Sequence, residues 1–313
     1  MKPTFDNPGQ KTGFTIIELL TVMSIIIVLI SILVPALNRV RRYASRVKQK
    51  AQFHSISVAL DLFNAEYEGY PPSDRWDGSG TGTVPYCGAM KLAEAMVGQD
   101  LKGFNLDSRF VAPLIPPQLP GPGILYPANP GTASPLYPDY VNNIKARRMY
   151  LQLENANAYL LKDIYSTTHL GTTAFDPCDM VLCDVYVRTM ATGSKIGMPI
   201  LYYKADTSRT EHDRTMPAAC GDTHYNIYDR CDNQDLVDIP LPWVTPSGPK
   251  HPMATTGSPT LLPGVNSDAG IFYDKTRNAK ATDRPYMADS YILMSAGFDG
   301  EYGTSDDIFN FGE

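Results

Sequence analysis

A long apolar run near the start of the chain limits what the whole sequence can fold into. Residues 14–37 make up 24 positions, and Glu18 is the only formal charge among them. As a helix the run would extend about 36 Å, enough to cross a hydrocarbon core about 30 Å thick. It is longer than the hydrophobic region of a cleaved secretory signal, which has about 7–15 residues. We therefore expect one transmembrane helix over residues 14–37.

The rest of the chain has the composition of a folded protein. Of its 313 residues, 43% are apolar and 19% are charged, which is enough apolar mass for a core of one or two domains. The net charge of −6 argues against binding to nucleic acid, although six Arg and Lys residues lie within positions 39–50. We expect no nucleic-acid partner.

The surroundings of Glu18 explain why a carboxylate lies in an apolar run. A charge inside a membrane is unfavourable unless it has a partner or a function. Residues 11–20 read KTGFTIIELL, a polar leader with Gly followed by Phe-Thr-x-x-Glu and an apolar helix. In this pattern the chain resembles the type IV pilin and type II secretion pseudopilin superfamily. The resemblance implies that a prepilin peptidase cuts between Gly13 and Phe14, methylates the new amine of Phe14, and removes residues 1–13 as a leader peptide.

The resemblance also implies assembly roles for two residues of this helix. The freed amine of Phe14 is a cation, and in a helical filament it can pair with Glu18 of a neighbouring subunit. A Glu18 that only snorkels toward the headgroups is the plainer alternative. Pro35 removes one hydrogen bond of the helix. The family implies that this proline lets the helix stretch on assembly, and a simple kink at the membrane exit is the alternative.

Two rules predict opposite topologies. The basic residues within positions 39–50 follow the apolar helix. Positive charges usually stay in the cytoplasm, and this rule would place the C-terminal body in the cytoplasm. The leader motif requires a cytoplasmic N-terminus for the peptidase, and we follow the motif. It implies a single-pass protein of the inner membrane whose C-terminal body is periplasmic or extracellular.

Helical periodicity continues beyond the apolar run. Apolar positions recur every three or four residues up to residue 63, ahead of Gly69 and two prolines. This predicts an amphipathic continuation over residues 38–69, half buried against a globular α+β region over residues 70–285 and a C-terminal strand and loop over residues 286–313. The expected fold class is α+β, with a long N-terminal helix packed on an antiparallel β-sheet domain that carries large loop insertions.

Regular and irregular segments alternate in the globular region. Nine prolines between residues 111 and 140 predict an extended loop. Apolar spacing predicts a second helix over residues 143–164. Alternating apolar residues predict a strand over residues 180–189, and further strands are expected over residues 199–204 and 290–295.

Five cysteines indicate disulfides in an exported domain. The economical arrangement is two disulfides with Cys87 left over, and their pairing is left open. The four candidates are Cys178, Cys183, Cys220 and Cys231. Zinc would require a ligand spacing that these cysteines lack, and no nucleophile or phosphate-binding motif is present. We expect no enzymatic activity.

The C-terminal 25 residues contain an acidic, glycine-rich loop. Calcium takes six to eight oxygens from carboxylates and carbonyls on flexible backbone. The loop resembles the C-terminal calcium loop of the major type II secretion pseudopilins, which implies calcium as a cofactor; an acidic, solvated turn is the alternative. The implied ligands are the carboxylates of Asp299, Asp306 and Asp307 and the backbone carbonyls of Ala296, Glu301 and Thr304.

The two resemblances predict a structural subunit of a type II secretion pseudopilus or a type IV pilus-like filament. Its expected partners are further copies of itself, the prepilin peptidase, the assembly platform of the inner membrane and other minor pilins. Two alternatives stay open. One is a minor pilin or adhesin that binds an extracellular ligand, and the other is a membrane-anchored enzyme with a single span.

Overall fold

The structure, a computed structural model, describes most of the chain. The described residues are 15–76, 85–105, 108, 110, 145, 147–171, 173, 175–214, 220, 225–254, 269–281 and 284–312. Gly13, Phe14 and the proline-rich residues 111–140 lie outside them. The described contacts divide the chain into two compact units, Met1–Ser45 and Arg46–Glu313.

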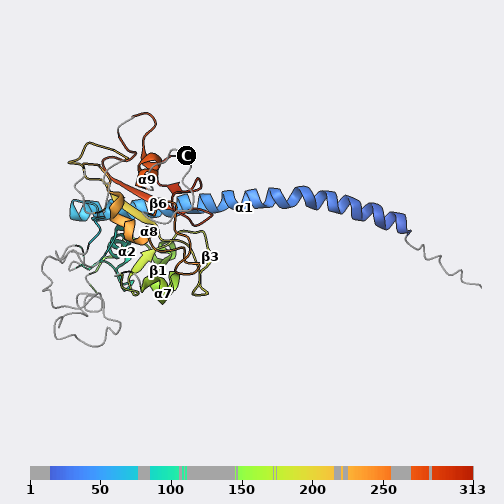
Figure 1. Cartoon of the computed structure of the whole chain (residues 1–313), viewed down its shortest axis with the longest axis horizontal. Helices are drawn as coiled ribbons and strands as arrows, with labels where there is room; N and C mark the ends of the chain where they lie inside the picture. The colour runs from blue at the N-terminus through green and yellow to red at the C-terminus, as the bar shows by residue number, and fades with distance from the viewer. Residues whose placement is uncertain are drawn as a thin grey trace, which may run out of the picture. The chain divides into compact units, whose positions relative to one another are not determined.

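One helix begins the described chain and continues from the first unit into the second. Helix α1 comprises Ile16–Tyr67, 52 residues that include Pro35 (Figure 1). By length and composition it is the one helix of the described residues that is long and apolar enough to cross a membrane or to serve as a signal. The helix ends where Glu68 adopts φ +54°, a left-handed conformation that cannot continue it.

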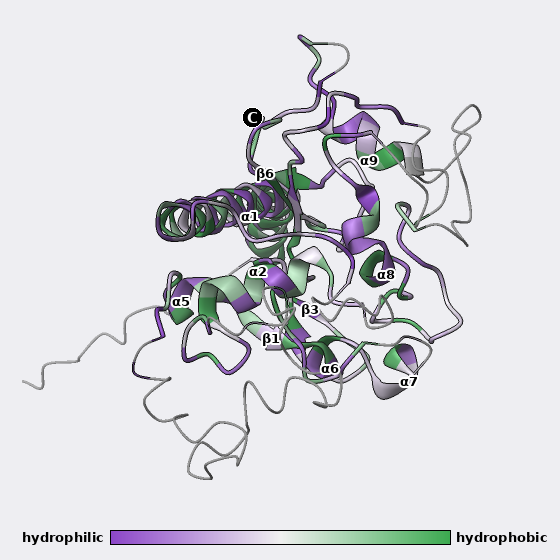
Figure 2. Cartoon of the chain, turned by 90° about the vertical axis from the view of Figure 1, so that its left-hand side faces the viewer, coloured by the Kyte–Doolittle hydropathy of each residue, from purple (hydrophilic) through white to green (hydrophobic). Residues whose placement is uncertain are grey.

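The part of α1 in the second unit is amphipathic and buries one stripe. Its buried residues recur at spacings of three and four, as expected for one face of a helix. They are Gln49, Gln52, Phe53, Ile56, Ala59, Leu60 and Phe63. Figure 2, which views α1 nearly along its axis, shows helix α2 (Gly88–Val97) and strand β6 (Tyr291–Ser295) beside it. The expected amphipathic packing of this segment is therefore present.

Antiparallel strands form the remainder of the predicted α+β fold, which is confirmed. The largest sheet has the order β5-β6-β7, with β5 at Leu201–Lys204 and β7 at Ile308–Phe309. In its register Leu201 pairs with Met294 and Ser295 pairs with Ile308. Two smaller antiparallel sheets pair β1 (Ala158–Leu160) with β2 (Met180–Leu182), and β3 (Arg188–Thr189) with β4 (Lys195–Ile196).

The central strand β6 separates two apolar cores. All five of its residues are buried, and successive side chains point to opposite faces. Tyr291 and Leu293 enter the core on the α1 side, and Ile292 and Met294 enter the other. The α1-side core includes Phe53, Ile56, Leu60, Phe63, Leu92, Met96 and Phe104. The loop-side core includes Tyr86, Met90, Leu201, Tyr203, Phe272 and Tyr302.

Short helices complete the second unit. Helix α2 contributes to both cores, and every one of its residues is buried. The other described helices are α5 (Leu153–Ala156), α6 (Leu161–Ile164), α7 (Thr167–Leu170), the 3-10 helix η1 (Arg230–Asn233), α8 (Gln234–Val237) and α9 (Ala269–Thr276).

Two sequence predictions of regular structure are wrong in their extent. The helix expected over residues 143–164 is replaced, over its described part, by α5, β1 and α6. Asn157 breaks it, because its φ of +48° is left-handed and its side-chain amide donates to the carbonyls of Cys183 and Asp184, at 2.9 and 2.6 Å. The strand expected over residues 180–189 ends at Leu182 and resumes only in β3.

A buried carboxylate lies where that expected strand breaks. The backbone amides of Tyr186 and Met198 both donate to Asp184 Oδ1 at 3.1 Å, and Ser295 Oγ donates to Oδ2 at 2.7 Å. Asp184 thus connects the end of β2 with the segment before β5 and with β6. Burial raises the pKa of Asp184 to about 7, and the three hydrogen bonds oppose the rise.

Asp184 should make the free energy of unfolding depend on pH. Its carboxyl keeps a proton up to about pH 7 in the folded chain and loses it near pH 4 in the unfolded chain. Between these values the folded state binds more protons, so the contribution is complete below about pH 4 and is lost as the pH rises to about 7. We expect a loss on the order of 4 kcal/mol over this range.

The Asp184→Asn variant tests this expectation, since asparagine keeps an oxygen for both amides and does not titrate. Denaturant unfolding of the full chain in detergent, at about pH 5 and pH 8, should show a smaller pH dependence for this variant than for the wild type. The control is Asp289→Asn, whose side chain is 89% exposed. Equal pH dependence in the wild type and Asp184→Asn would contradict the expectation.

Candidate functional site

Glu18 forms a capping box with Thr15 at the start of α1. The Thr15 amide donates to Glu18 Oε2 at 2.8 Å, and the Thr15 hydroxyl donates to the same oxygen at 2.7 Å. The Glu18 amide donates in return to Thr15 Oγ1 at 3.3 Å. These bonds satisfy amide groups that have no partner within the helix. Within a single chain, Glu18 therefore stabilises the first turn of α1.

This role of Glu18 was not predicted, although Thr-x-x-Glu ahead of an apolar run is the pattern of a capping box. The predicted partner of Glu18 was the amine of a neighbouring subunit, with snorkelling toward the headgroups as the alternative. That amine belongs to Phe14, which lies outside the described residues, so the intermolecular pair stays a prediction.

The first part of α1, up to Leu37, is apolar around its whole circumference. Every residue from 15 to 44 is exposed in the isolated chain. Residues 25–30 are six consecutive apolar side chains, which cover all directions around a helix of 3.6 residues per turn. The large apolar side chains exposed here are Ile16, Ile17, Leu19, Leu20, Val22, Met23, Ile25, Ile26, Ile27, Val28, Leu29, Ile30, Ile32, Leu33, Val34 and Leu37.

Water is an unfavourable surrounding for this segment. Covering one such side chain stabilises by about 1.5–3 kcal/mol, so covering the whole set contributes tens of kcal/mol. A helix that is apolar all round belongs inside lipid or inside a bundle of similar helices, not on the surface of a globular body.

The C-terminal acidic loop lies between β6 and β7 and is folded by its own hydrogen bonds. The Asp299 amide donates to Asp306 Oδ2 at 2.9 Å, and the Glu301 amide donates to Asp299 Oδ1 at 2.8 Å. Thr304 Oγ1 donates to Asp306 Oδ1 at 2.6 Å. Asp299 and Asp306 also bond to each other through their side chains.

The paired carboxylates differ in their affinity for protons. Burial and the hydrogen bond with Asp306 raise the pKa of Asp299 to about 6. Burial favours a higher pKa for Asp306 as well, but the hydrogen bonds from Asp299 and Thr304 outweigh it and lower the pKa of that carboxyl. Asp299 is therefore the member of the pair that holds a proton at acidic pH.

The third acidic residue faces a lysine. Asp307 Oδ2 lies 2.8 Å from Lys275 Nζ of α9, and the side chain of Asp307 is only 1% exposed. The amide of Gly303 donates to the same oxygen at 3.0 Å. Burial raises the pKa of the Asp307 carboxyl to about 7, with the Lys275 ammonium as the main opposing influence.

The implied calcium carboxylates have different partners. Asp299 and Asp306 face each other, whereas Asp307 Oδ2 faces Lys275. Within the described ranges, no group of three or more His, Cys, Asp or Glu side chains is placed to hold a metal ion. The implied set also includes three backbone carbonyls, so calcium binding by the six residues stays a prediction.

Gly297 closes the acidic loop against β7 and provides a test of the loop geometry. Its φ is +70°, and a Cβ atom there would lie 2.2 Å from the Asp306 carbonyl oxygen. Gly312 has a similar φ of +74° with open space around it. Gly297→Ala should therefore destabilise the full chain by at least about 2 kcal/mol more than Gly312→Ala in denaturant unfolding. Equal losses would contradict the close approach.

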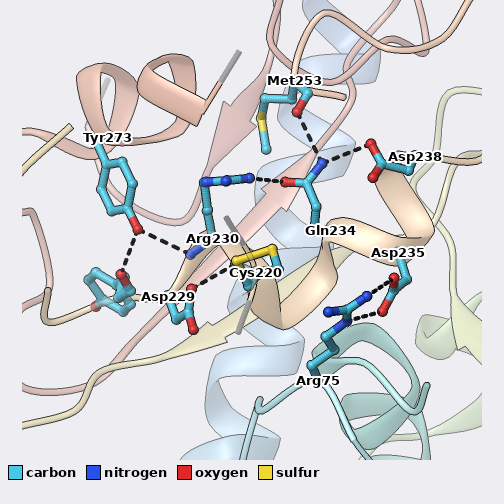
Figure 3. The surroundings of a disulfide bond; sticks show 11 residues. Arg75, Cys220, Asp229, Arg230, Gln234, Asp235, Asp238, Met253 and Tyr273 are labelled. Carbon is cyan, nitrogen blue, oxygen red and sulfur yellow. Dashed lines mark hydrogen bonds and ion pairs between the residues drawn. A yellow bond between two sulfur atoms is a disulfide. The ribbon is translucent and has the colours of Figure 1, made fainter. Parts of the chain in front are cut away.

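One disulfide is present among the described cysteines. Cys220 and Cys231 are bonded, and their Cα atoms are 5.5 Å apart. Figure 3 shows the disulfide beside η1 and α8, where the Asp229 side chain accepts from the Cys231 amide and Arg230 donates to Gln234. The bond joins residue 220 to the start of η1.

The expected second disulfide is not formed. Cys183 is buried in the loop-side core at the end of β2, whereas Cys178 is exposed 3.9 Å from Lys162 Nζ. A side chain packed in the core cannot reach a partner on the surface, so both thiols are free. Cys87, expected to be left over, is free and buried at the start of α2.

A cleft of about 380 Å³ opens beside α9. Its lining carries both signs of charge, and Arg214 pairs with Asp274 across 3.1 Å. His212 Nε2 lies 2.8 Å from the Tyr273 carbonyl, and burial lowers the pKa of this histidine. The lining residues are Thr210, Glu211, His212, Asp213, Arg214, Tyr273, Asp274 and Arg277.

Comparison with known proteins adds no relative. No family model, curated protein or solved structure matches this chain. The architecture itself, a long apolar N-terminal helix followed by antiparallel sheets, is consistent with a pilin-like protein.

Proposed function

We propose that this chain is a non-enzymatic structural subunit of a type II secretion pseudopilus or a type IV pilus-like filament. The observation that carries the proposal is the fully exposed, all-round apolar first part of α1. Lipid would cover this segment while the subunit is stored, and the same segments of other subunits would cover it in a filament. The globular second unit would then lie on the outside.

The proposal places the stored subunit in the inner membrane with its N-terminus in the cytoplasm. The prepilin peptidase would act there on the Gly13–Phe14 bond. The assembly platform would then transfer the subunit into the filament, with its body in the periplasm or outside the cell. The KTGFTIIELL motif supports each of these steps.

Glu18 would bind two partners, one after the other. In the stored subunit it would cap the first turn of α1 through Thr15, at 2.7 and 2.8 Å. In the filament it would accept the Phe14 amine of a neighbour, which neutralises both charges in a surrounding of low polarity. The capping box favours this exchange because it holds the carboxylate at the end of the helix where the neighbouring amine would arrive.

Two variants separate the capping role of Glu18 from its assembly role. Glu18→Ala removes the carboxylate, whereas Thr15→Val removes only the hydroxyl half of the capping box. If Glu18 binds a neighbour, the amount of subunit in the sheared filament fraction should fall more than about tenfold in Glu18→Ala and stay near wild type in Thr15→Val. Immunoblots of the membrane fraction serve as the control for insertion and cleavage. Equal filament yields in both variants would reject the assembly role.

The cleft beside α9 favours a second candidate, a minor pilin or adhesin that binds an extracellular ligand. Because acidic and basic side chains both line the cleft, it suits a ligand with polar or charged groups. Immunogold labelling distinguishes the two candidates, because a major subunit decorates the filament along its length and a minor one labels its tip.

A further inference from the structure

The positive charge of Lys275 lies against the acidic C-terminal loop. It belongs to the last turn of α9, and its ammonium is 2.8 Å from Asp307 Oδ2. The same ammonium donates a hydrogen bond to the carbonyl of Thr304. Asp307 and Thr304 are two of the six ligands that the sequence assigned to calcium, so a lysine already contacts a third of that set.

Other implied ligands are also occupied by groups of the chain. Both carboxylate oxygens of Asp306 accept hydrogen bonds, one from Thr304 Oγ1 and one from the Asp299 amide. Asp299 Oδ1 accepts from the Glu301 amide, and the Glu301 carbonyl accepts from Thr304 Oγ1 at 3.3 Å. Donors of the chain therefore reach each of these carboxylates, whose oxygens keep further lone pairs.

Lys275 and Asp307 carry single, opposite charges and form an ion pair. The Asp307 side chain is 1% exposed and that of Lys275 is 21% exposed, so their attraction is little screened by water. One ammonium neutralises the single charge of Asp307, and its three donors suit a carboxylate and a carbonyl. A divalent ion beside this ammonium would be repelled by it.

We propose that the Lys275 ammonium is the resident cation of the C-terminal loop and holds the loop closed in place of a calcium ion. Through this contact α9 is tied to the loop between β6 and β7. The folded body therefore requires no calcium. Lys275 holds the loop closed whether or not the chain polymerises.

Calcium dependence of the wild-type chain is the first test. The full chain in detergent, at about pH 8, is melted with excess EDTA and again with millimolar calcium, followed by circular dichroism. The proposal expects the same melting temperature in both. A rise with calcium that magnesium does not reproduce would overturn it, because the loop would then bind calcium despite Lys275.

The second test removes the ammonium and keeps most of the side chain. Lys275→Met should lower the melting temperature by roughly 5 °C, because it leaves the buried Asp307 without its countercharge. The matched control is Lys280→Met, at an exposed position shortly after α9. Equal melting of these two variants would overturn the proposal.

A double variant distinguishes a charge effect of Lys275 from a packing effect. Lys275→Met combined with Asp307→Asn leaves no unpaired charge, so it should melt above the single Lys275→Met variant. If the double variant melts no higher than the single one, Lys275 acts through packing alone and the proposal fails.

Discussion

The covering of α1 is the constraint on which the rest of this structure depends. A single helix of 52 residues has two kinds of surroundings along its length. From residue 15 to residue 44 every side chain is exposed, and the apolar ones point in all directions. From Gln49 onward one stripe is buried in the core of the second unit. The first part therefore requires a cover that the described residues do not provide, and the second part anchors it to a folded body.

The folded second unit packs against the buried stripe of α1. Strand β6 lies between two cores, and one of them contains the buried stripe of α1. Two buried carboxylates of this unit have partners within the chain: Asp184 accepts three hydrogen bonds where β2 ends, and Asp307 Oδ2 faces Lys275 of α9. The disulfide between Cys220 and Cys231 adds a covalent tie at η1. A rigid body of this kind would keep the exposed helix available for other copies.

Sequence periodicity predicted the helix through residue 63, and short apolar runs matched the strands that became β5 and β6. Helix α2 was not predicted, and all its residues are buried, Lys91 and Glu94 included. The helix expected over residues 143–164 failed at Asn157, whose side chain bonds to a distant segment that local spacing cannot reveal. For the same reason the contact of Lys275 with Asp307, 32 residues away, could not be predicted from a motif that described the loop alone.

In the proposed assembly, the apolar part of α1 is freed from its leader and then shared among copies of this chain. Intact-mass measurement of the chain in sheared filaments is the decisive experiment. We expect residues 1–13 to be absent and the mature chain to begin at Phe14 with one added methyl group. A chain that retains residues 1–13 and stays entirely in the membrane fraction would contradict it.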